Sequence, residues 1–279
     1  GSTHSLVDLN RAGTPLIEIV SEPDIRSADE AKAYVEKLKT ILQHMNICDG
    51  NMEEGSLRAD VNISLKPKGH ETFGTRTEVK NLNSFRSLHR AIYVEMERQE
   101  EILRSGGVVI QETRNYDDNK QVTTSLRSKE DAHDYRYFPE PDLLPLVLTE
   151  DYIQKIKDNL PDLPEEKIKK YQEEYGLTDF DCKVLIGDVE IDHYFQACLK
   201  NAKDCEPKDI CKWVIGDLNA FLKDTDQTFK TTKATPEKLA QIVNLIKKGD
   251  ISGKIAKQVL EHVINTGDDP NDHIKKAGL

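Results

Sequence analysis

Residues 56–67, SLRADVNISLKP, alternate apolar and polar side chains, and this alternation predicts a β-strand with one buried face. A turn at Lys68-Gly69-His70 follows, and residues 74–82, GTRTEVKNL, then alternate again with more polar residues. Two such runs separated by a short turn are typical of an antiparallel pair. We therefore expect a small sheet built around these two strands.

Amphipathic helices flank the predicted pair on both sides in the chain. Residues 27–45 open with Ser27 and Glu30 in the spacing of a capping box, and apolar residues then recur at helical intervals. Residues 84–104 show the same periodicity and are followed by two glycines, which commonly end a helix. Both segments are predicted to be amphipathic helices, and the second is predicted to turn its apolar residues toward the core.

Three further strands are predicted in the same part of the chain. Residues 14–20, TPLIEIV, form a short apolar run that contains one acid, Glu18. Residues 108–117 and 121–128 predict two more strands, joined by a turn at 117–120. An acid within an apolar strand is unusual and marks Glu18 for attention.

The pattern changes near residue 148. Residues 133–149 hold three prolines and three aromatics and predict an extended segment packed over the first domain, whereas only helical patterns follow. The predicted fold class is therefore α+β. We expect a mostly antiparallel sheet with helices in a domain of residues 1–148 and an all-helical domain of residues 149–279, with a further division near 225–235.

Composition excludes several classes of protein. The chain has 279 residues, 37% of them hydrophobic, and contains no apolar run of the length of about 18 residues that a membrane span requires. Its five cysteines form no C-x-x-C pair, which favours a reducing, cytoplasmic setting over a disulfide framework or a zinc cluster. A net charge of −11 argues against general affinity for nucleic acid, so any such contact must be local.

Acidic residues gather at strand positions of the first domain. They are Glu18, Glu53, Glu54, Asp60 and Glu78. Carboxylates that converge on one face of a sheet can bind Mg²⁺, which takes one or two carboxylates together with water and phosphate oxygens. The alternative is that Glu18 and Glu53 form ordinary ion pairs with arginines such as Arg58 and Arg76.

The segment KNLNSF, residues 80–85, lies where a strand ends and a helix begins. Lys80 and the unpaired amides of the helix N-terminus would suit an anion, and Asn81, Asn83 and Ser84 add polar side chains. Helix capping alone could also explain Asn83 and Ser84. No Walker P-loop and no G-x-S-x-G motif occurs, so neither that nucleotide-binding loop nor a serine hydrolase is supported.

Four motifs together resemble one known family. They are SLVDLNRAGTPLIEIVSEPDIRS, MEEGSLRADVNISL, FGTRTEVKNLNSF and DYRYFPEPDLLPL. The chain is similar through them to the B subunit of the tRNA-dependent amidotransferase, the GatB family. The similarity is dense over about residues 5–148 and looser through the helical part.

This resemblance implies an ATP-dependent ligase of protein biosynthesis that acts within a heterotrimer. The family uses ATP and Mg²⁺ to activate the side-chain carboxylate of glutamyl-tRNA(Gln) or aspartyl-tRNA(Asn). It then amidates the activated group with ammonia that the amidase partner, the A subunit, releases from glutamine and passes through a channel. A small C subunit stabilises the complex. The implied partners are therefore these two subunits together with misacylated tRNA, in the cytoplasm.

The resemblance also implies roles for individual residues. Glu18 is the expected Mg²⁺ ligand. The expected catalytic residues are Glu53, Glu54, Ser56, Arg58 and Asp60, and the expected ATP- or substrate-binding residues are Lys80, Asn81, Asn83 and Ser84. Asp134, Arg136 and Asp142 are expected to line the ammonia channel.

Two parts of the family pattern are not found. The family's catalytic domain begins with a G-L-E-V-H segment that supplies further metal ligands, and its C-terminal tail resembles the YqeY proteins. Without them we expect this polypeptide to be inactive alone. The alternative function is a non-catalytic module that binds tRNA and assembles the subunits.

Overall fold

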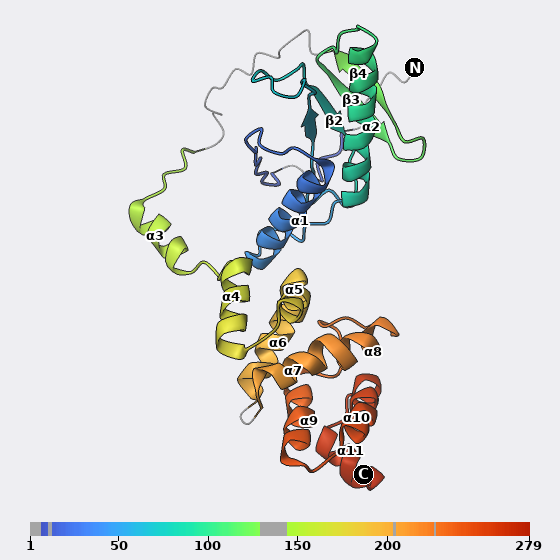
Figure 1. Cartoon of the computed structure of the whole chain (residues 1–279). Coiled ribbons are helices and arrows are strands. Elements are labelled where there is room, and N and C mark those ends of the chain that lie inside the picture. The colour runs from blue at the N-terminus through green and yellow to red at the C-terminus, as the bar shows by residue number, and fades with distance from the viewer. Residues whose placement is uncertain (1–6, 11–12, 129–143, 203–204, 226) are drawn as a thin grey trace.

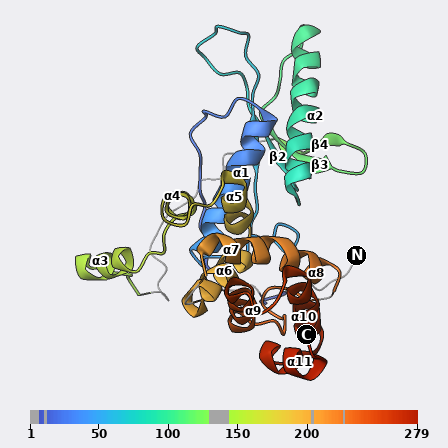
Figure 2. The ribbon, with the colours of Figure 1, turned by 60° about the horizontal axis from the view of Figure 1, so that its bottom comes forward.

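The computed structural model describes residues 7–10, 13–128, 144–202, 205–225 and 227–279. The chain forms two halves, one containing the strands and the other only helices (Figures 1 and 2). The two halves have separate hydrophobic core clusters. The predicted α+β fold class, with its helical C-terminal part, is confirmed.

The sheet has four strands in the order in which they occur along the chain. They are β1 (Val61–Ile63), β2 (Thr77–Lys80), β3 (Glu112–Asp117) and β4 (Val122–Ser128). β1 pairs with β2 in antiparallel fashion, as predicted. β3 also pairs with β4 in antiparallel fashion, whereas β2 and β3 run parallel. The parallel pairing follows from the long helix that connects these two strands, because a crossover returns the chain to the same end of the sheet.

Helices α1 (Ala28–His44) and α2 (Phe85–Arg104) match the two predicted helices. Ser27 accepts a hydrogen bond from the Glu30 backbone N–H at 3.1 Å, and Ser84 accepts one from the Ser87 N–H at 3.0 Å. Such caps stabilise a helix by about 1 kcal/mol each. Both helices pack with β1 and β2 in one hydrophobic core, and α2 lies against one face of the sheet (Figure 1).

A buried carboxylate holds α2 to this face. Glu95 is completely buried and accepts hydrogen bonds from Thr77 on β2 at 2.7 Å and from Thr123 on β4 at 2.8 Å. Arg98 donates two hydrogen bonds to it, and the Arg114 guanidinium on β3 lies 3.4 Å away. Glu95 therefore has the opposite charges and hydrogen-bond donors that a buried carboxylate requires.

The neighbouring Gln99 extends this network to the remaining strand. Its Nε2 donates to the backbone carbonyl of Ile63 on β1 at 3.1 Å and lies 3.0 Å from a Glu95 oxygen. The sequence periodicity predicts Met96 and Ile102 on the core side of this helix, and Met96 does pack, partly buried, against the core. In the structure Glu95 and Gln99 are buried there, so polar contacts as well as apolar ones fix α2 on the sheet.

The second half consists of helices joined by short breaks. They are α3 (Glu150–Asp158), α4 (Pro164–Tyr175), α5 (Asp179–Gly187), α6 (Val189–Asn201), α7 (Pro207–Trp213), a π-helical segment (Val214–Leu218), α8 (Asn219–Lys223), α9 (Pro236–Lys248), α10 (Gly253–Thr266) and α11 (Pro270–Ala277). One core cluster contains buried residues from Tyr171 to Ile264. It includes residues on both sides of the polar stretch near 225–235, so the helices before and after that stretch share a core. The predicted domain boundaries stay predictions.

Helix α3 differs from the other helices. None of its residues is buried, and it stands apart from the rest of the chain in both views (Figures 1 and 2). The residues before it, 144–148, are also exposed, with Leu144 92% and Leu146 85% accessible. The predicted packing of this segment over the first domain is therefore wrong for 144–148, and residues 133–143 lie outside the described part.

The predicted strand at residues 14–20 is also absent. This segment has no regular structure, and Leu16 and Val20 are 76% and 80% exposed. A strand is stable only when a neighbour takes its backbone hydrogen bonds, and none of the four strands pairs with these residues. For the same reason the regular part of the predicted strand 56–67 is limited to β1, the three residues that face β2.

We predict that Glu95→Gln destabilises the sheet half by about 3 kcal/mol, because it removes the charge that Arg98 and Arg114 compensate within the fold. Amide hydrogen exchange of β2 and β4 is the measurement, since it reports on this half alone. Glu97→Gln, at an exposed position of the same helix, is the matched control and should leave exchange unchanged. Equal exchange rates in the two variants would contradict the role given to Glu95.

The same carboxylate should make stability depend on pH. Burial alone would raise the pKa of Glu95, but hydrogen bonds from Arg98, Gln99, Thr77 and Thr123 lower it from 4.5 to about 2. A lowered pKa stabilises the fold above pH 4.5, and this contribution of about 3 kcal/mol is lost as the pH falls from 4.5 towards 2. Urea unfolding across this pH range should show the loss of stability. The loss should be smaller in Glu95→Gln, which cannot titrate at this position.

Candidate functional site

The sheet presents two different faces. Val79 and Tyr116 are buried in the core beneath α1 and α2, and Thr77 and Arg114 meet Glu95 on that side. Because side chains alternate along a strand, the residues between them lie on the opposite face, here called the second face. It carries Asn62, Glu78, Lys80, Thr113 and Asn115, which are brought together by the registers Asn62 to Glu78, Glu78 to Thr113 and Lys80 to Asn115.

Lys80 lies between two carboxylates on the second face. Its Nζ is 2.6 Å from an Asp60 oxygen and 3.3 Å from a Glu78 oxygen. The hydrogen bond to Asp60 raises the pKa of Lys80, and Glu78 adds to this effect. The other Glu78 oxygen accepts a hydrogen bond from the Thr113 hydroxyl at 2.8 Å. The structure thus joins two predicted site residues, Asp60 and Lys80, and holds the lysine charged.

The segment after Lys80 turns sharply into α2. Asn81 has a left-handed backbone, with φ 68°, and its amide donates to the Tyr116 carbonyl at 3.2 Å. The Asn83 amide donates in turn to the Asn81 side chain, and Ser84 caps the helix. These three predicted residues therefore build the strand-to-helix turn that leads into the N-terminus of α2, which carries a partial positive charge.

The turn that contains the predicted acids is organised by Asn51 and Asp49. The Asn51 side-chain oxygen accepts the backbone N–H of Glu53 at 3.0 Å and lies 3.4 Å from that of Glu54. Hydrogen bonds from the Asn51 N–H and the Ser56 hydroxyl lower the pKa of Asp49. Glu53 and Glu54 themselves are exposed at the tip of the turn, where a ligand could reach them.

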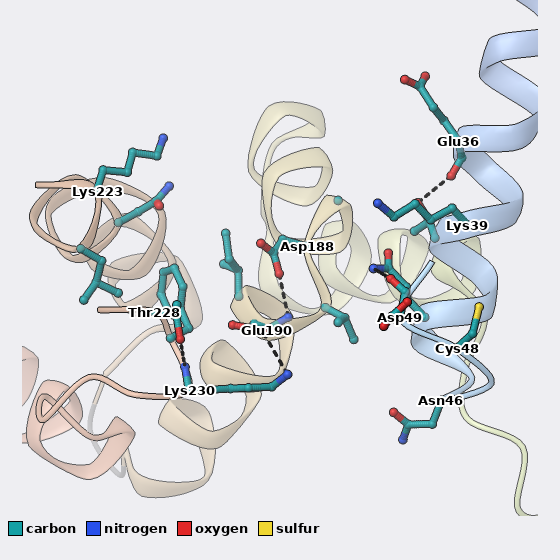
Figure 3. Close-up of a pocket in the computed structure, with 18 of the residues that line it drawn as sticks. Glu36, Lys39, Asn46, Cys48, Asp49, Asp188, Glu190, Lys223, Thr228 and Lys230 are labelled. Carbon is teal, nitrogen blue, oxygen red and sulfur yellow. Dashed lines mark hydrogen bonds and ion pairs between the residues drawn. The ribbon is translucent and has the colours of Figure 1, made fainter. Parts of the chain in front are cut away.

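A cavity of about 1040 Å³ lies next to this turn, between the two halves of the chain (Figure 3). On one side Lys39, Asn46 and Asp49 line it from α1 and the residues after α1. On the other side its charged residues are Asp188, Glu190, Lys223 and Lys230, and Lys230 pairs with Glu190 at 2.9 Å. Phe85, which follows the cap Ser84, also lines the cavity. The cavity therefore borders both the turn that carries Glu53 and the segment that ends at Ser84.

The remaining predicted residues are not brought together. Glu18 and Arg58 are exposed outside regular structure, and neither this cavity nor a smaller one of about 460 Å³ is lined by Glu18, Glu53 or Asp60. Within the described residues, the alternative ion pairs of Glu18 and Glu53 with Arg58 or Arg76 are not formed. The predicted channel residues Asp134, Arg136 and Asp142 lie outside the described part of the chain.

The predicted acidic residues do not form a complete metal site in the described part of the chain. Among the described residues, no group of three or more His, Cys, Asp or Glu side chains could hold a metal ion. Asp60 and Glu78 already share the Lys80 ammonium, and Glu18 is an exposed residue outside regular structure. The role of Glu18 as a Mg²⁺ ligand therefore stays a prediction.

Two parts of this site were missed from the sequence. Thr113 holds Glu78 only because β2 and β3 are parallel neighbours, and no local pattern identifies that pairing. The cavity depends on the contact between α1 and the helical half, which sequence periodicity does not reveal. Over the described residues, no helix has the length and apolar character to cross a membrane.

Comparison with known proteins matches two regions of the chain. Residues 1–154 match the family described as "GatB/GatE catalytic domain", and residues 193–279 match the model described as "GatB domain" (GatB_Yqey). The sequence motifs show no YqeY-like tail in this chain. Residues 193–279 nevertheless match a model that carries the YqeY name.

Bacterial relatives are similar along almost the whole chain. Proteins named as the B subunit of "Aspartyl/glutamyl-tRNA(Asn/Gln) amidotransferase" from Persephonella marina and Caldicellulosiruptor bescii are 48% and 49% identical to it, over 99% of this chain. The same-named protein of Bacillus licheniformis is 48% identical over the full 279 residues. The chain spans 58% of the length of each of these three relatives.

The contacts of Lys80 predict how its pKa responds to substitution. Asp60→Asn should lower the pKa of Lys80 towards its ordinary value, and more than Glu78→Gln does, because the Asp60 hydrogen bond is the larger cause of the shift. NMR titration of ¹³C-methylated lysines, with the Lys80 signal assigned from Lys80→Arg, measures both. Asp151→Asn on α3 is the control without effect. A larger shift in Glu78→Gln would contradict the geometry.

Proposed function

The chain belongs to the GatB/GatE family, and on that premise we propose that it acts as the B subunit of a tRNA-dependent amidotransferase. In this function it activates the side-chain carboxylate of glutamyl-tRNA(Gln) or aspartyl-tRNA(Asn) with ATP and amidates it. The observation that carries the proposal is the charged Lys80 held beside Asp60 on the second face, within the region that matches the family's catalytic domain.

The residues of this site have separate tasks in the proposed reaction. Lys80 and the N-terminus of α2 provide positive charge for a phosphate group, and Asp60 and Glu78 keep the lysine protonated and in place. Glu53, Glu54, Ser56 and Arg58 on the adjoining turn would approach the acyl end of the substrate. ATP supplies the leaving group that makes the carboxylate reactive. Most of the catalytic effect then comes from positioning and electrostatic stabilisation.

The proposed partners are misacylated tRNA, an amidase subunit, and a small third subunit, in the cytoplasm. Exposed apolar side chains support contact with other subunits, since Leu16 and Leu144 are 76% and 92% accessible and lie in stretches of further exposed apolar residues. The net charge of −11 restricts tRNA to local contacts, such as the lysines near the ends of α9 and α11.

A second function is favoured by the scattered placement of the acidic residues. Because the described residues do not gather a metal-binding group, the chain could bind tRNA and assemble the subunits without turning over ATP itself. This function needs the helical half and the exposed apolar segments but not Lys80. The two functions therefore differ in their dependence on a single side chain.

We predict that Lys80→Met lowers amidation of glutamyl-tRNA(Gln) by about 100-fold, because the reacting phosphate loses its positive charge. The assay combines the chain with the amidase and small subunits, ATP, Mg²⁺ and glutamine, and measures glutaminyl-tRNA(Gln). Lys120→Met, at the exposed turn between β3 and β4, is the matched control and should retain activity.

Binding of tRNA distinguishes the two functions. Titration of the chain with tRNA at low and high salt should show weaker binding at high salt, because phosphate contacts are screened. If the wild-type chain amidates glutamyl-tRNA(Gln) and Lys80→Met does so equally well, the assignment of the site is overturned. No amidation together with retained tRNA binding would support the assembly function, and loss of both would reject both functions.

A further inference from the structure

Polar contacts join the two halves of the chain at α1. Their hydrophobic clusters are separate, and α1 of the sheet half contacts both α4 and α6. His44, the last residue of α1, is buried at this junction although it belongs to neither cluster. On the surface, an exposed ion pair between Lys37 of α1 and Glu165 of α4, at 2.6 Å, also links the two halves.

His44 joins three helices of the other half. Its Nε2 lies 2.9 Å from the backbone carbonyl of Ile186 on α5, and its Nδ1 lies 3.1 Å from the Lys167 ammonium on α4. Lys167 also donates to Asp192 on α6 at 2.7 Å. The hydroxyl of Tyr171 donates to the other Asp192 oxygen, so the buried carboxylate has donors at both oxygens.

These contacts fix the protonation of the imidazole. A carbonyl can only accept, so Nε2 carries the hydrogen, and an ammonium can only donate, so Nδ1 must offer its lone pair. His44 is therefore neutral in this arrangement, while Lys167 and Asp192 form an ion pair. A proton on Nδ1 would face the Lys167 ammonium directly and break that contact.

The cavity depends on the same contact. Gln43 and Asn46, on either side of His44 in the chain, line one wall, and Gly187 and Asp188, which follow Ile186, line the other. The hydrogen bond from His44 to Ile186 thus ties the two walls together at one end of the cavity. Rotation about this contact would widen or narrow the space between them.

We propose that His44, Lys167 and Asp192 form a joint that fixes the angle between the two halves and sets the width of the cavity. Resting on the proposed function, we further assign these three as positioning residues, which place the helical half and the sheet half at the spacing that one tRNA molecule requires. They act through the arrangement of the halves and do not contact the reacting groups. The joint itself does not depend on the enzymatic function.

The joint should open as the pH falls. Burial lowers the pKa of His44, and the Lys167 ammonium lowers it further, against the opposing effects of the Ile186 carbonyl and Asp192. The other titratable group facing it from α6 is His193, which also lowers it. A histidine with a lowered pKa stabilises the folded arrangement above pH 6.5, and this stabilisation is lost as the pH falls below 6.5.

The distance between the halves tests the joint directly. Spin labels on genetically encoded keto amino acids at Glu101 of α2 and Lys275 of α11, both exposed, report this distance by pulsed electron resonance without using the native cysteines. We expect a narrow distance distribution at about pH 7.5 and a wider one at about pH 5.5, on either side of the ordinary histidine pKa. Lys167→Met, which leaves Asp192 buried without its counter-charge, should give the wide distribution at both pH values.

A matched pair of histidine variants separates the joint from general acid effects. His44→Asn keeps an acceptor for Lys167 but cannot titrate, so its distribution should not change with pH. His262→Asn removes a histidine on α10 that pairs with Asp268 at 2.9 Å, away from the joint, and should respond to pH as the wild type does. A wild-type distribution that is independent of pH, or a His44→Asn variant that still responds, would overturn the proposal.

The positioning role is tested in the reconstituted amidotransferase. Lys167→Met should raise KM for aminoacyl-tRNA about tenfold and change kcat by less than about twofold, the pattern of a residue that affects binding and not chemistry. If Lys167→Met widens the distance distribution but leaves KM unchanged, the joint is supported and the positioning role is rejected. A complex without wild-type activity would reject the proposed function, while the distance measurement would still decide on the joint.

Discussion

The buried carboxylate of Glu95 is the interaction on which the sheet half depends. Together with Gln99 it contacts all four strands, through Ile63, Thr77, Arg114 and Thr123. A sheet this small, with a first strand of three residues, has few ladder hydrogen bonds of its own. Directional bonds from one helix to every strand specify the order and register of the sheet in a way that apolar packing alone does not.

The side chains that face the helices determine which side chains lie on the second face of the sheet. When Thr77 and Val79 face the helices, Glu78 and Lys80 must lie on the second face, because side chains alternate along β2. The register between β2 and β3 then brings Thr113 to Glu78. Lys80 thus receives a fixed position from strands that are themselves held by α2, and a charged group held on strands is placed more accurately than one on a loop.

The sequence predicted those features that depend on neighbouring residues. The cap at Ser27, both long helices and the pair of β1 and β2 follow from local spacing and are confirmed. At Ser84 the structure shows the capping role that the sequence offered as an alternative. The burial of Glu95 could not be predicted, because a glutamate within a charged helical segment is usually exposed. Likewise the run at 14–20 has the composition of a strand but no partner strand, and partners are supplied by the fold as a whole.

The sheet and the joint use buried charge for different purposes. Around Glu95 every partner belongs to the same half, so the network makes one rigid body. At His44 the partners belong to different halves, and an uncharged imidazole links α1 to the ion pair of Lys167 and Asp192. An apolar junction would be insensitive to protonation and would tolerate sliding, whereas this one has directional contacts and a titrating group at its centre. The molecule therefore combines a rigid site with an adjustable spacing between that site and the helical half.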